Sequence, residues 1–376
     1  MDNSLRQAYK INGQIKRTPQ IVPFISVPER IKTFPTTRYY GSKRKLIGWI
    51  FENIKNLTFE TVLDGFGGTA SVSLLFKSMG KCVTYHDAFN FNTFTANAVL
   101  SNKMHLNKTK FENTLQSVEL IDGVINKYFK NVFYTNSENM WLDGFMNKLD
   151  ADSLAINQKS IYLYALFQAC LQKRPFNLFH RANLSLRLTK HVERNFGNMT
   201  TWERGFPELM LRAYDELAHC VWNTGGKYKV IPSTDILNIE PEYDLVYLDP
   251  PYINKSASRN RDDYWMKYHF LEGLANYNEW EQKIDLASDI KITPKSPEFE
   301  LWNQASSFKE CLFELIEKHS KSIVVLSYVS DAYPDEKELL QFFVSKFHSV
   351  SFHSRLHSHA LAKQTKRELM FIGIPA

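Results

Sequence analysis

The tetrapeptide Asp249-Pro250-Pro251-Tyr252 has the composition of a binding site for an amine-bearing ring. It directly follows the apolar run 243–248, which reads as a buried strand. Asp249 is therefore expected at the carboxyl end of that strand, where open α/β sheets bind ligands. Because the prolines fix the backbone and donate no N–H, the loop presents carbonyl oxygens. A carboxylate, a row of acceptors and an aromatic ring suit a flat heterocycle that carries an amino group. A chance turn of the same four residues is the alternative.

A glycine loop, Asp64-Gly65-Phe66-Gly67-Gly68-Thr69, forms a second candidate site between a predicted strand at 61–64 and a predicted helix at 70–79. Small residues let backbone N–H groups approach a ligand, and a helix N-terminus favours negative charge. The third glycine of the dinucleotide fingerprint is missing, and no Lys-Ser/Thr pair follows as in a phosphate loop. A ligand with a carboxylate and a nucleoside therefore fits better than a polyphosphate. An ordinary tight turn is the alternative.

Asp87 ends a second predicted strand at 82–86 and follows Asp64 by 23 positions. The βαβ nucleotide-binding pattern places a ribose-binding acid at about this spacing. A surface acid at the end of a strand is the alternative interpretation.

The alternation of strands and helices breaks after Asp87 and resumes with strands predicted at 228–231, 244–248, 322–327 and 368–372. The intervening stretch is far longer than the connections of a doubly wound sheet, so an inserted domain is expected. We predict an N-terminal arm at 1–36, a catalytic domain at 37–96 and 227–376, and an inserted domain at 97–226.

A basic stretch at 172–194 lies inside the predicted insertion and interleaves cations with aromatic and amide side chains. Six Lys and Arg residues oppose one acid, Glu193. Lys and Arg can neutralise phosphates, while Arg, Asn and Gln can contact base edges. A solvated helix face or a packing loop is the alternative. The predicted nucleic-acid contacts are Lys173, Arg174, Asn177, Arg181, Asn183 and Arg187.

Two further clusters are ambiguous on their own. The basic cluster 41–45 is typical of a solvated face. The aromatic stretch 263–269 is compatible with a lid or with the core.

Composition indicates a globular protein: the 376 residues are 44% hydrophobic and 23% charged. No run approaches the ~18–20 apolar residues of a membrane span. The N-terminus lacks the apolar core of a signal peptide. The four cysteines lie far apart, without zinc spacing or a disulfide framework. A cytoplasmic setting without a bound metal is expected, and the net charge of +6 permits a polyanionic partner.

Taken together, the chain from about Arg38 to Pro375 resembles the adenine-specific DNA methyltransferases, in particular the DNA adenine methylase group. That group carries its target-recognition domain between the cofactor loop and the catalytic motif, which is the order here. Two departures are Gly65, where the family usually has proline or a bulkier residue, and Ala70, where it usually has glycine. The resemblance implies an α/β fold: a Rossmann-like, S-adenosylmethionine-dependent methyltransferase sheet with an inserted, mainly helical target-recognition domain.

The resemblance also implies roles for individual residues. Residues 249–252 look like the catalytic motif: Asp249 and the Pro250 carbonyl would accept the amine hydrogens, and Tyr252 would stack on a flipped adenine. Residues 234–236 resemble the segment that contacts the cofactor adenine. Residues 38–43 are similar to the motif that completes the cofactor pocket, which gives the basic cluster a role. The implied cofactor-binding residues are Tyr39, Lys43, Asp64, Phe66, Gly68, Asp87, Asp235 and Asp249.

The implied activity is site-specific methylation of adenine in double-stranded DNA, with S-adenosylmethionine as cofactor. A restriction–modification system of a bacterium or phage, with a companion endonuclease, is the expected context. An RNA adenine methyltransferase and a catalytically inactive DNA-binding protein are the alternatives. Enzymes that methylate protein glutamine usually have asparagine at the first motif position, so Asp249 favours a nucleic acid.

Overall fold

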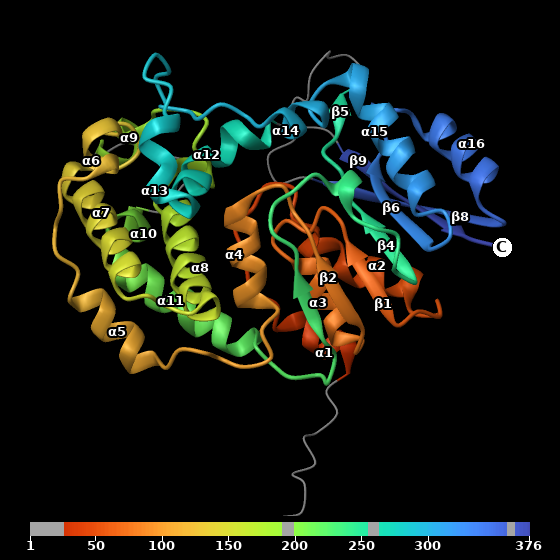
Figure 1. Cartoon of the computed structure of the whole chain (residues 1–376), viewed down its shortest axis with the longest axis horizontal. Coiled ribbons are helices and arrows are strands. Elements are labelled where there is room, and N and C mark those ends of the chain that lie inside the picture. Colours follow the sequence, from red (N-terminus) through yellow and green to blue (C-terminus); the bar gives the residue numbers. More distant parts are fainter. Residues whose placement is uncertain (1–25, 190–198, 255–262, 359–364) are drawn as a thin grey trace, which may run out of the picture.

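A sheet organises the molecule, and its seven strands are β1 (Thr61–Asp64), β2 (Cys82–Tyr85), β3 (Tyr228–Val230), β4 (Leu245–Leu248), β6 (Ile323–Val329), β8 (Ser349–Ser358) and β9 (Thr365–Ile374). The computed structural model describes residues 26–189, 199–254, 263–358 and 365–376. The strand order is β3-β2-β1-β4-β6-β9-β8 (Figure 1). The first five strands in this order run parallel, and β9 runs antiparallel to β6 and β8. The order reverses between β1 and β4, so their carboxyl ends form the topological switch point.

The strands predicted from apolar runs all form and all belong to this sheet. The helix predicted at 70–79 is also present, as α3 (Ser71–Ser78). The α/β fold class is therefore confirmed. The edge strand β8 was not predicted, because its sequence has no continuous apolar run and separates its apolar residues by Ser, His and Arg. A short pairing of β5 (Ile253–Asn254) with β7 (Ala332–Tyr333) lies outside the main sheet.

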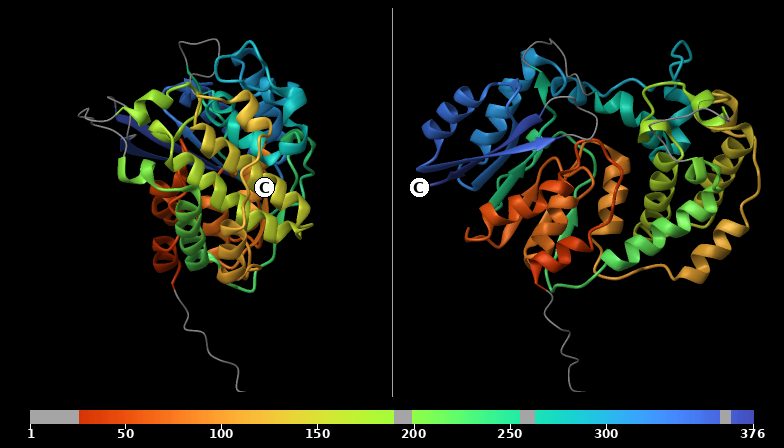
Figure 2. Two further views of the ribbon diagram at one scale, coloured as in Figure 1. Left: turned by 90° about the vertical axis from the view of Figure 1, so that its left-hand side faces the viewer. Right: turned by 180° about the vertical axis from the view of Figure 1, so that it is seen from behind.

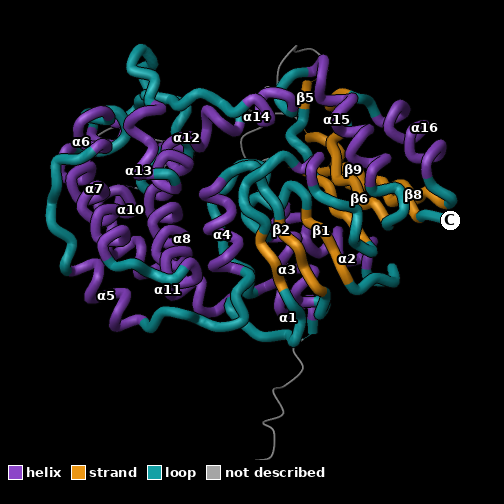
Figure 3. The backbone as a smooth tube through the Cα atoms, in the orientation of Figure 1, coloured by secondary structure: helices purple, strands orange, loops and turns teal. Residues whose placement is uncertain are grey.

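Helices cover both faces of the sheet and form a second group beside it (Figures 1 and 3). Their bounds are α1 (Val27–Lys32), α2 (Ile47–Ile54), α4 (Asn90–Val99), α5 (Lys108–Gln116), α6 (Val124–Tyr128), α7 (Asn136–Ala151), α8 (Ile156–Gln172), α9 (Leu184–Leu188), α10 (Met199–Glu203), α11 (Phe206–Cys220), α12 (Tyr264–Ala275), α13 (Tyr277–Trp280), α14 (Pro297–Leu301), α15 (Ala305–Lys318) and α16 (Glu336–Lys346). Short 3-10 turns are η1 (Lys43–Leu46), η2 (Pro175–Asn177), η3 (Ile236–Asn238) and η4 (Glu281–Lys283).

Alternate residues of the central strand β4 face two separate hydrophobic clusters. Leu245 and Tyr247 pack into the cluster that contains α2, α3 and the helical group. Val246 and Leu248 pack into the cluster that contains α15 and α16. Successive side chains of a strand point to opposite faces, so a strand covered on both faces is apolar throughout. This explains the continuous apolar run before Asp249.

The helical group beside the sheet comes mainly from the chain between β2 and β3, where an insertion was predicted (Figure 2). Helices α12 and α13 follow β5, yet α12 packs against α4 and α8. The buried carboxylate of Glu272 on α12 accepts hydrogen bonds from the backbone N–H groups of Asn90 and Phe91, 3.2 and 3.1 Å away, at the start of α4. The domain division at 97 and 226 remains a prediction, and α12 belongs spatially with the helical group.

The predicted arm, 1–36, contains α1, which packs against α2 and α3. Arg44 Nε donates to the Pro35 carbonyl at 2.9 Å. The end of this segment is therefore part of the folded body, while residues 1–25 lie outside the described residues. Among the described residues, no helix is both long and apolar enough to cross a membrane.

Candidate active site

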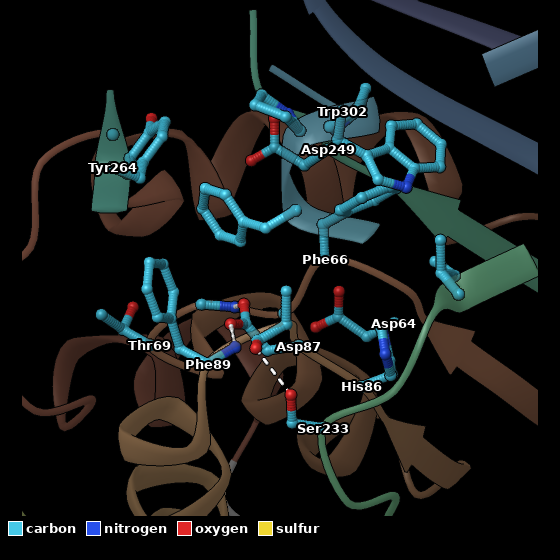
Figure 4. A pocket seen from close by; sticks show the side chains of 18 of the residues that line it. Asp64, Phe66, Thr69, His86, Asp87, Phe89, Ser233, Asp249, Tyr264 and Trp302 are labelled. Carbon is cyan, nitrogen blue, oxygen red and sulfur yellow. Dashed lines mark hydrogen bonds between the residues drawn. The ribbon is translucent and has the colours of Figure 1, made fainter. Parts of the chain in front are cut away.

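A cavity of about 570 Å³ opens at the topological switch point. Its walls come from the glycine loop after β1, the acid after β2, the segment after β3, the motif after β4, and α14. Figure 4 shows Asp64, Asp87 and Asp249 around it, with Asp249 across the cavity from Asp87. The structure brings together all the residues expected at the cofactor and catalytic sites: Tyr39, Lys43, Asp64, Phe66, Gly68, Asp87, Asp235, Asp249, Pro250, Pro251 and Tyr252.

The glycine loop is held in place by three backbone contacts. Gly65 N donates to the Tyr247 carbonyl at 3.0 Å, and Gly67 N donates to the His86 carbonyl at 2.9 Å. The Tyr85 hydroxyl donates to the Gly68 carbonyl at 2.7 Å. A Cβ added to Gly67 would lie 2.2 Å from Tyr85 Cε2, so this close approach requires glycine. These hydrogen bonds fix the backbone of the loop against β2 and β4.

Replacing Gly67 with alanine is expected to destabilise the protein by about 1–3 kcal/mol, because the Tyr85 ring has no room to move. Displacement of the loop should also weaken binding of S-adenosylmethionine, the cofactor that the sequence resemblance implies, by about tenfold or more. Thermal unfolding and calorimetric titration measure the two effects. The matched control is Gly48→Ala on α2, where an added Cβ meets nothing within 4 Å. Equal cofactor affinity in the Gly67 variant and the wild type would contradict the assignment of the glycine loop to the cofactor site.

Two buried acids, Asp64 and Asp87, line the cavity. Burial raises the pKa of Asp64 to about 7, although Ser73 Oγ donates to its Oδ2 at 2.7 Å. Burial also raises the pKa of Asp87. Gly68 N donates to Asp87 Oδ2 and Phe89 N donates to Oδ1, both at 2.9 Å. These hydrogen bonds fix the orientation of both carboxyl groups at the wall of the cavity.

His86 connects the glycine loop to the segment after β3, a role that the sequence did not indicate. Its Nδ1 lies 2.7 Å from the Gly65 carbonyl, and its Nε2 lies 2.8 Å from the Thr234 carbonyl. Asp235, next in the chain, accepts a hydrogen bond from Leu237 N at 3.0 Å and begins η3. The two walls of the cavity are thereby joined through one buried ring.

Asp249 lies at the end of β4 in a network of polar side chains. Lys43 Nζ is 3.1 Å from Asp249 Oδ1. The Tyr252 hydroxyl donates to the same oxygen at 2.5 Å and accepts from Lys43 Nζ at 2.7 Å. Lys43 Nζ also lies 3.4 Å from Glu368 Oε2 on β9. Lys43, which was expected at the cofactor, therefore contacts the catalytic motif directly.

Burial and neighbouring charge act in opposite directions on this network. Burial raises the pKa of Asp249, while the Lys43 ammonium and the Tyr252 hydroxyl lower it. Burial lowers the pKa of Lys43, yet Asp249 and Glu368 together raise it above its ordinary value. Lys43 is therefore a permanent cation between two carboxylates.

Aromatic side chains complete the cavity, and the sequence did not single out three of them, Phe89, Phe299 and Trp302. Phe66 contacts Trp302, after α14, edge to face with ring centres 5.0 Å apart. Tyr39 stacks between Tyr264 and Tyr268, at 6.0 and 4.6 Å. Within the stretch 263–269, Tyr268 is buried in the core and Tyr264 lines the cavity, while a role as a lid remains a prediction.

The structure argues against four of the six predicted nucleic-acid contacts, because Lys173, Arg174, Asn183 and Arg187 are buried. Lys173 Nζ lies 3.0 Å from Glu138 Oε1, and Arg187 pairs with the same carboxylate. These cations neutralise a half-buried acid. The packing-loop alternative therefore describes them correctly.

Arg174 has a structural role as well. Its guanidinium donates to the carbonyls of Phe133, Leu178 and Arg181 at 3.1, 3.2 and 2.8 Å, and to the Asn183 side chain. Of the six residues predicted to contact nucleic acid, Asn177 and Arg181 have solvent-accessible side chains. Asn177 is half-buried and Arg181 is exposed. Lys190 and Arg194 of the basic stretch lie outside the described residues.

Residues 39–303 match a family model described as D12 class N6 adenine-specific DNA methyltransferase. The match covers most of the chain and contains the glycine loop, Asp87 and the motif 249–252. Its first and last residues, Tyr39 and Asn303, both line the cavity. Glu368 lies beyond the matched residues. No curated protein matches the chain.

Proposed function

Because the chain belongs to the D12 class of N6 adenine-specific DNA methyltransferases, we propose that it transfers a methyl group from S-adenosylmethionine to an adenine turned out of duplex DNA. The single observation that carries this proposal is the shared cavity: the glycine loop and the acceptors of Asp249 open into the same space. A base stacked inside a duplex could not contact a carboxylate that lines such a cavity.

The residues present fit S-adenosylmethionine. The cavity volume of about 570 Å³ lies within the range of small-molecule sites. We propose that Asp87 accepts hydrogen bonds from ribose hydroxyls and that Asp235 and Ile236 contact the adenine. Asp64, Phe66 and Gly68 would surround the methionine portion, beside Tyr39. Bound there, the cofactor supplies an electrophilic methyl group on a positively charged sulfur.

The chain's own contribution to the reaction is to position the target amine. The adenine N6 lone pair is delocalised into the ring, which makes it a poor nucleophile. Asp249 and the Pro250 carbonyl would each accept one N–H, which favours a tetrahedral nitrogen with its lone pair directed at the methyl group. Alignment and fixed acceptors of this kind contribute several kcal/mol. Asp249 is also placed to take the proton that the amine loses on methylation, and Tyr252 would stack on the base.

The test is a transfer assay with S-adenosylmethionine labelled on its methyl group. Label is expected in N6-methyladenine of duplex DNA, and matched RNA should remain unlabelled. Transfer to RNA alone would favour the RNA alternative. Binding of DNA without binding of the cofactor in a calorimetric titration would favour an inactive DNA-binding protein.

Binding of the cationic cofactor is expected to depend on pH through Asp64. Its pKa of about 7 means that the free protein holds a proton there below pH 7. A positively charged ligand favours the ionised carboxylate, so binding below pH 7 must release this proton. Affinity should therefore rise with pH by up to about tenfold per unit below 7 and level off above it. Calorimetry in buffers of different ionisation enthalpy measures the released proton.

The control is Asp64→Asn, which should show no proton release from this group. Any pH dependence that persists in that variant belongs to another group, such as Asp87 or the cofactor's own amino group. An unchanged profile would assign the proton elsewhere.

We propose that the loop 175–183 contacts DNA through Asn177 and Arg181. The buried Arg174 guanidinium organises this loop, and Phe179 N attaches it to α12 by donating to the Lys267 carbonyl at 3.0 Å. Lys267 Nζ lies 3.7 Å from the centre of the Tyr40 ring, beside the cavity residues Tyr39 and Gly41. The loop is therefore linked through α12 to the mouth of the cavity.

Arg181→Ala is expected to weaken DNA binding without destabilising the fold, and to reduce the salt slope of binding by about one. The matched variant Arg174→Ala should instead destabilise the protein by more than about 3 kcal/mol, because several buried carbonyls lose their donor. DNA titrations at several salt concentrations and thermal unfolding separate the two. An unchanged salt slope in Arg181→Ala would remove this residue from the interface.

A restriction–modification context with a companion endonuclease remains part of the proposal. Sequencing DNA from an expressing host for N6-methyladenine identifies the methylated site. Protection of that DNA from an endonuclease of matching specificity would support this context.

A further inference from the structure

Asp87, the carboxylate proposed for the cofactor ribose, accepts three hydrogen bonds from the described part of the chain. Gly68 N donates to its Oδ2 and Phe89 N donates to its Oδ1, both at 2.9 Å. The third donor is the side-chain amide of Asn92, whose Nδ2 lies 3.0 Å from Oδ1. Asn92 was not among the residues expected at the cofactor site, yet its side chain contacts one of them directly.

The Asn92 amide is buried, with 1% of the residue exposed. It lies on α4, which stands between the sheet and the helical group (Figure 1). A buried amide is costly unless it is hydrogen-bonded, so its bond to Asp87 satisfies the amide and orients the acid. Burial raises the pKa of Asp87, and the hydrogen bond from Asn92 opposes that rise. The amide therefore favours the ionised carboxylate, which is the form that accepts hydrogen bonds.

The two oxygens of Asp87 differ in how many donors they meet. An ionised carboxylate has about four acceptor positions, two on each oxygen. Oδ1 accepts from both Phe89 N and Asn92 Nδ2, whereas Oδ2 accepts from Gly68 N. Among the described residues, Oδ2 is therefore the oxygen with capacity for a further donor. Without the Asn92 amide each oxygen would keep one donor, and the carboxyl group could rotate between two similar orientations.

The position of Asn92 is fixed by a contact between α4 and α12. Phe89 precedes α4 and makes no side-chain hydrogen bond that would cap the helix. Glu272 of α12 supplies the acceptors instead: its Oε1 accepts from Asn90 N at 3.2 Å and its Oε2 from Phe91 N at 3.1 Å. The first N–H groups of a helix require such partners. The first turn of α4, which carries Asn92, is thereby held in place.

We propose that Asn92 is a positioning residue for the cofactor ribose. Its amide holds Asp87 Oδ1, so that Oδ2 accepts from a ribose hydroxyl of S-adenosylmethionine. Within the described chain, Asn92 lies outside the lining of the cavity, so it acts through Asp87. It should therefore affect the binding of the cofactor and not the chemical step. This inference rests on the proposed use of S-adenosylmethionine.

The test measures the affinities of S-adenosylhomocysteine and of its 2′,3′-dideoxy analogue for the full-length wild type and for Asn92→Leu, by calorimetry. Leucine keeps the branched shape of the side chain and cannot donate. The variant should bind S-adenosylhomocysteine about tenfold more weakly, with its affinity for the dideoxy analogue unchanged. In transfer assays the KM for S-adenosylmethionine should rise by about the same factor, while kcat stays the same.

The matched control is Asn97→Leu, which makes the same substitution on the same helix. The Asn97 amide donates within α4, to the Thr93 carbonyl at 3.1 Å, so neither affinity should change. Asn92→Leu in an Asp87→Ala background should not weaken the binding of S-adenosylhomocysteine further, because both changes act on one contact. Asn92→Ala removes the donor without adding bulk, and it decides the question if the leucine variant fails to fold.

An equal loss of both affinities in Asn92→Leu, or no loss of either, would overturn the inference. So would additive losses in the double variant. Failure of both Asn92 variants to fold would show that the residue is structural, with the same consequence. If the wild type binds S-adenosylhomocysteine and methylates DNA, such results leave the proposed function intact. If the wild type does not bind S-adenosylhomocysteine, the proposed function fails first and the inference fails with it.

Discussion

Replacing Asp249 with alanine is expected to abolish methyl transfer and to weaken the binding of S-adenosylmethionine, while leaving the binding of DNA largely intact. The side chain is 16% exposed and lines the cavity, so it can reach a bound base. Its removal takes away one of the two acceptors that orient the amine, and we expect kcat to fall by about 10³-fold or more. Single-turnover transfer with labelled cofactor measures the chemical step, and titrations measure the two affinities.

The matched control for this variant is Asp215→Ala. Asp215 also pairs with a lysine, Lys108, at 2.8 Å, but both side chains are 49% exposed. Exposed ion pairs contribute little to stability, so this variant should behave as the wild type does. Full transfer activity in Asp249→Ala would contradict the catalytic assignment.

Lys43→Met is expected to have the second largest effect, because it removes the cation that pairs with the buried Glu368 carboxylate and the half-buried Asp249 carboxylate. Removing one partner of a buried ion pair destabilises proteins by about 3–5 kcal/mol. Lys43 lowers the pKa of Asp249 in the wild type, so its loss should raise that pKa further. Only the ionised carboxylate is a pure acceptor, and the acid limb of the pH–rate profile should therefore move to higher pH.

Chemical denaturation measures the change in the stability of Lys43→Met. Rates of methyl transfer between pH 5.5 and about 9 show the position of the acid limb of the pH–rate profile. Lys108→Met removes the cation of the exposed pair with Asp215 and should change neither quantity. A Lys43 variant with an unshifted profile would place the titrating group elsewhere than on Asp249.

Local sequence patterns correctly predicted the central strands of the sheet. Apolar runs identified the central strands, because strands covered on both faces must be apolar throughout. Asp64, Asp87 and Asp249 each follow such a run, and parallel strands bring their carboxyl ends to one edge of the sheet. Their convergence on one cavity therefore follows from the strand pattern alone. The edge strand β8, which pairs on one side only, had no such signal.

The tertiary structure decided which charges face a ligand and which face the protein. The basic stretch at 172–194 has the same composition whether its cations contact phosphates or a half-buried acid of the protein itself. Glu138, which pairs with Lys173 and Arg187, lies 49 positions before Arg187, and nothing local signals that contact.

Glu368 illustrates the same limit at the active site. In sequence it is one acid at the start of an apolar strand, far from the catalytic motif. Folding places it 3.4 Å from Lys43. Strand periodicity is a property of neighbouring residues, whereas the partner of a buried charge depends on how distant elements pack. The sequence alone therefore located the proposed catalytic carboxylate, and only the folded chain shows which groups contact it.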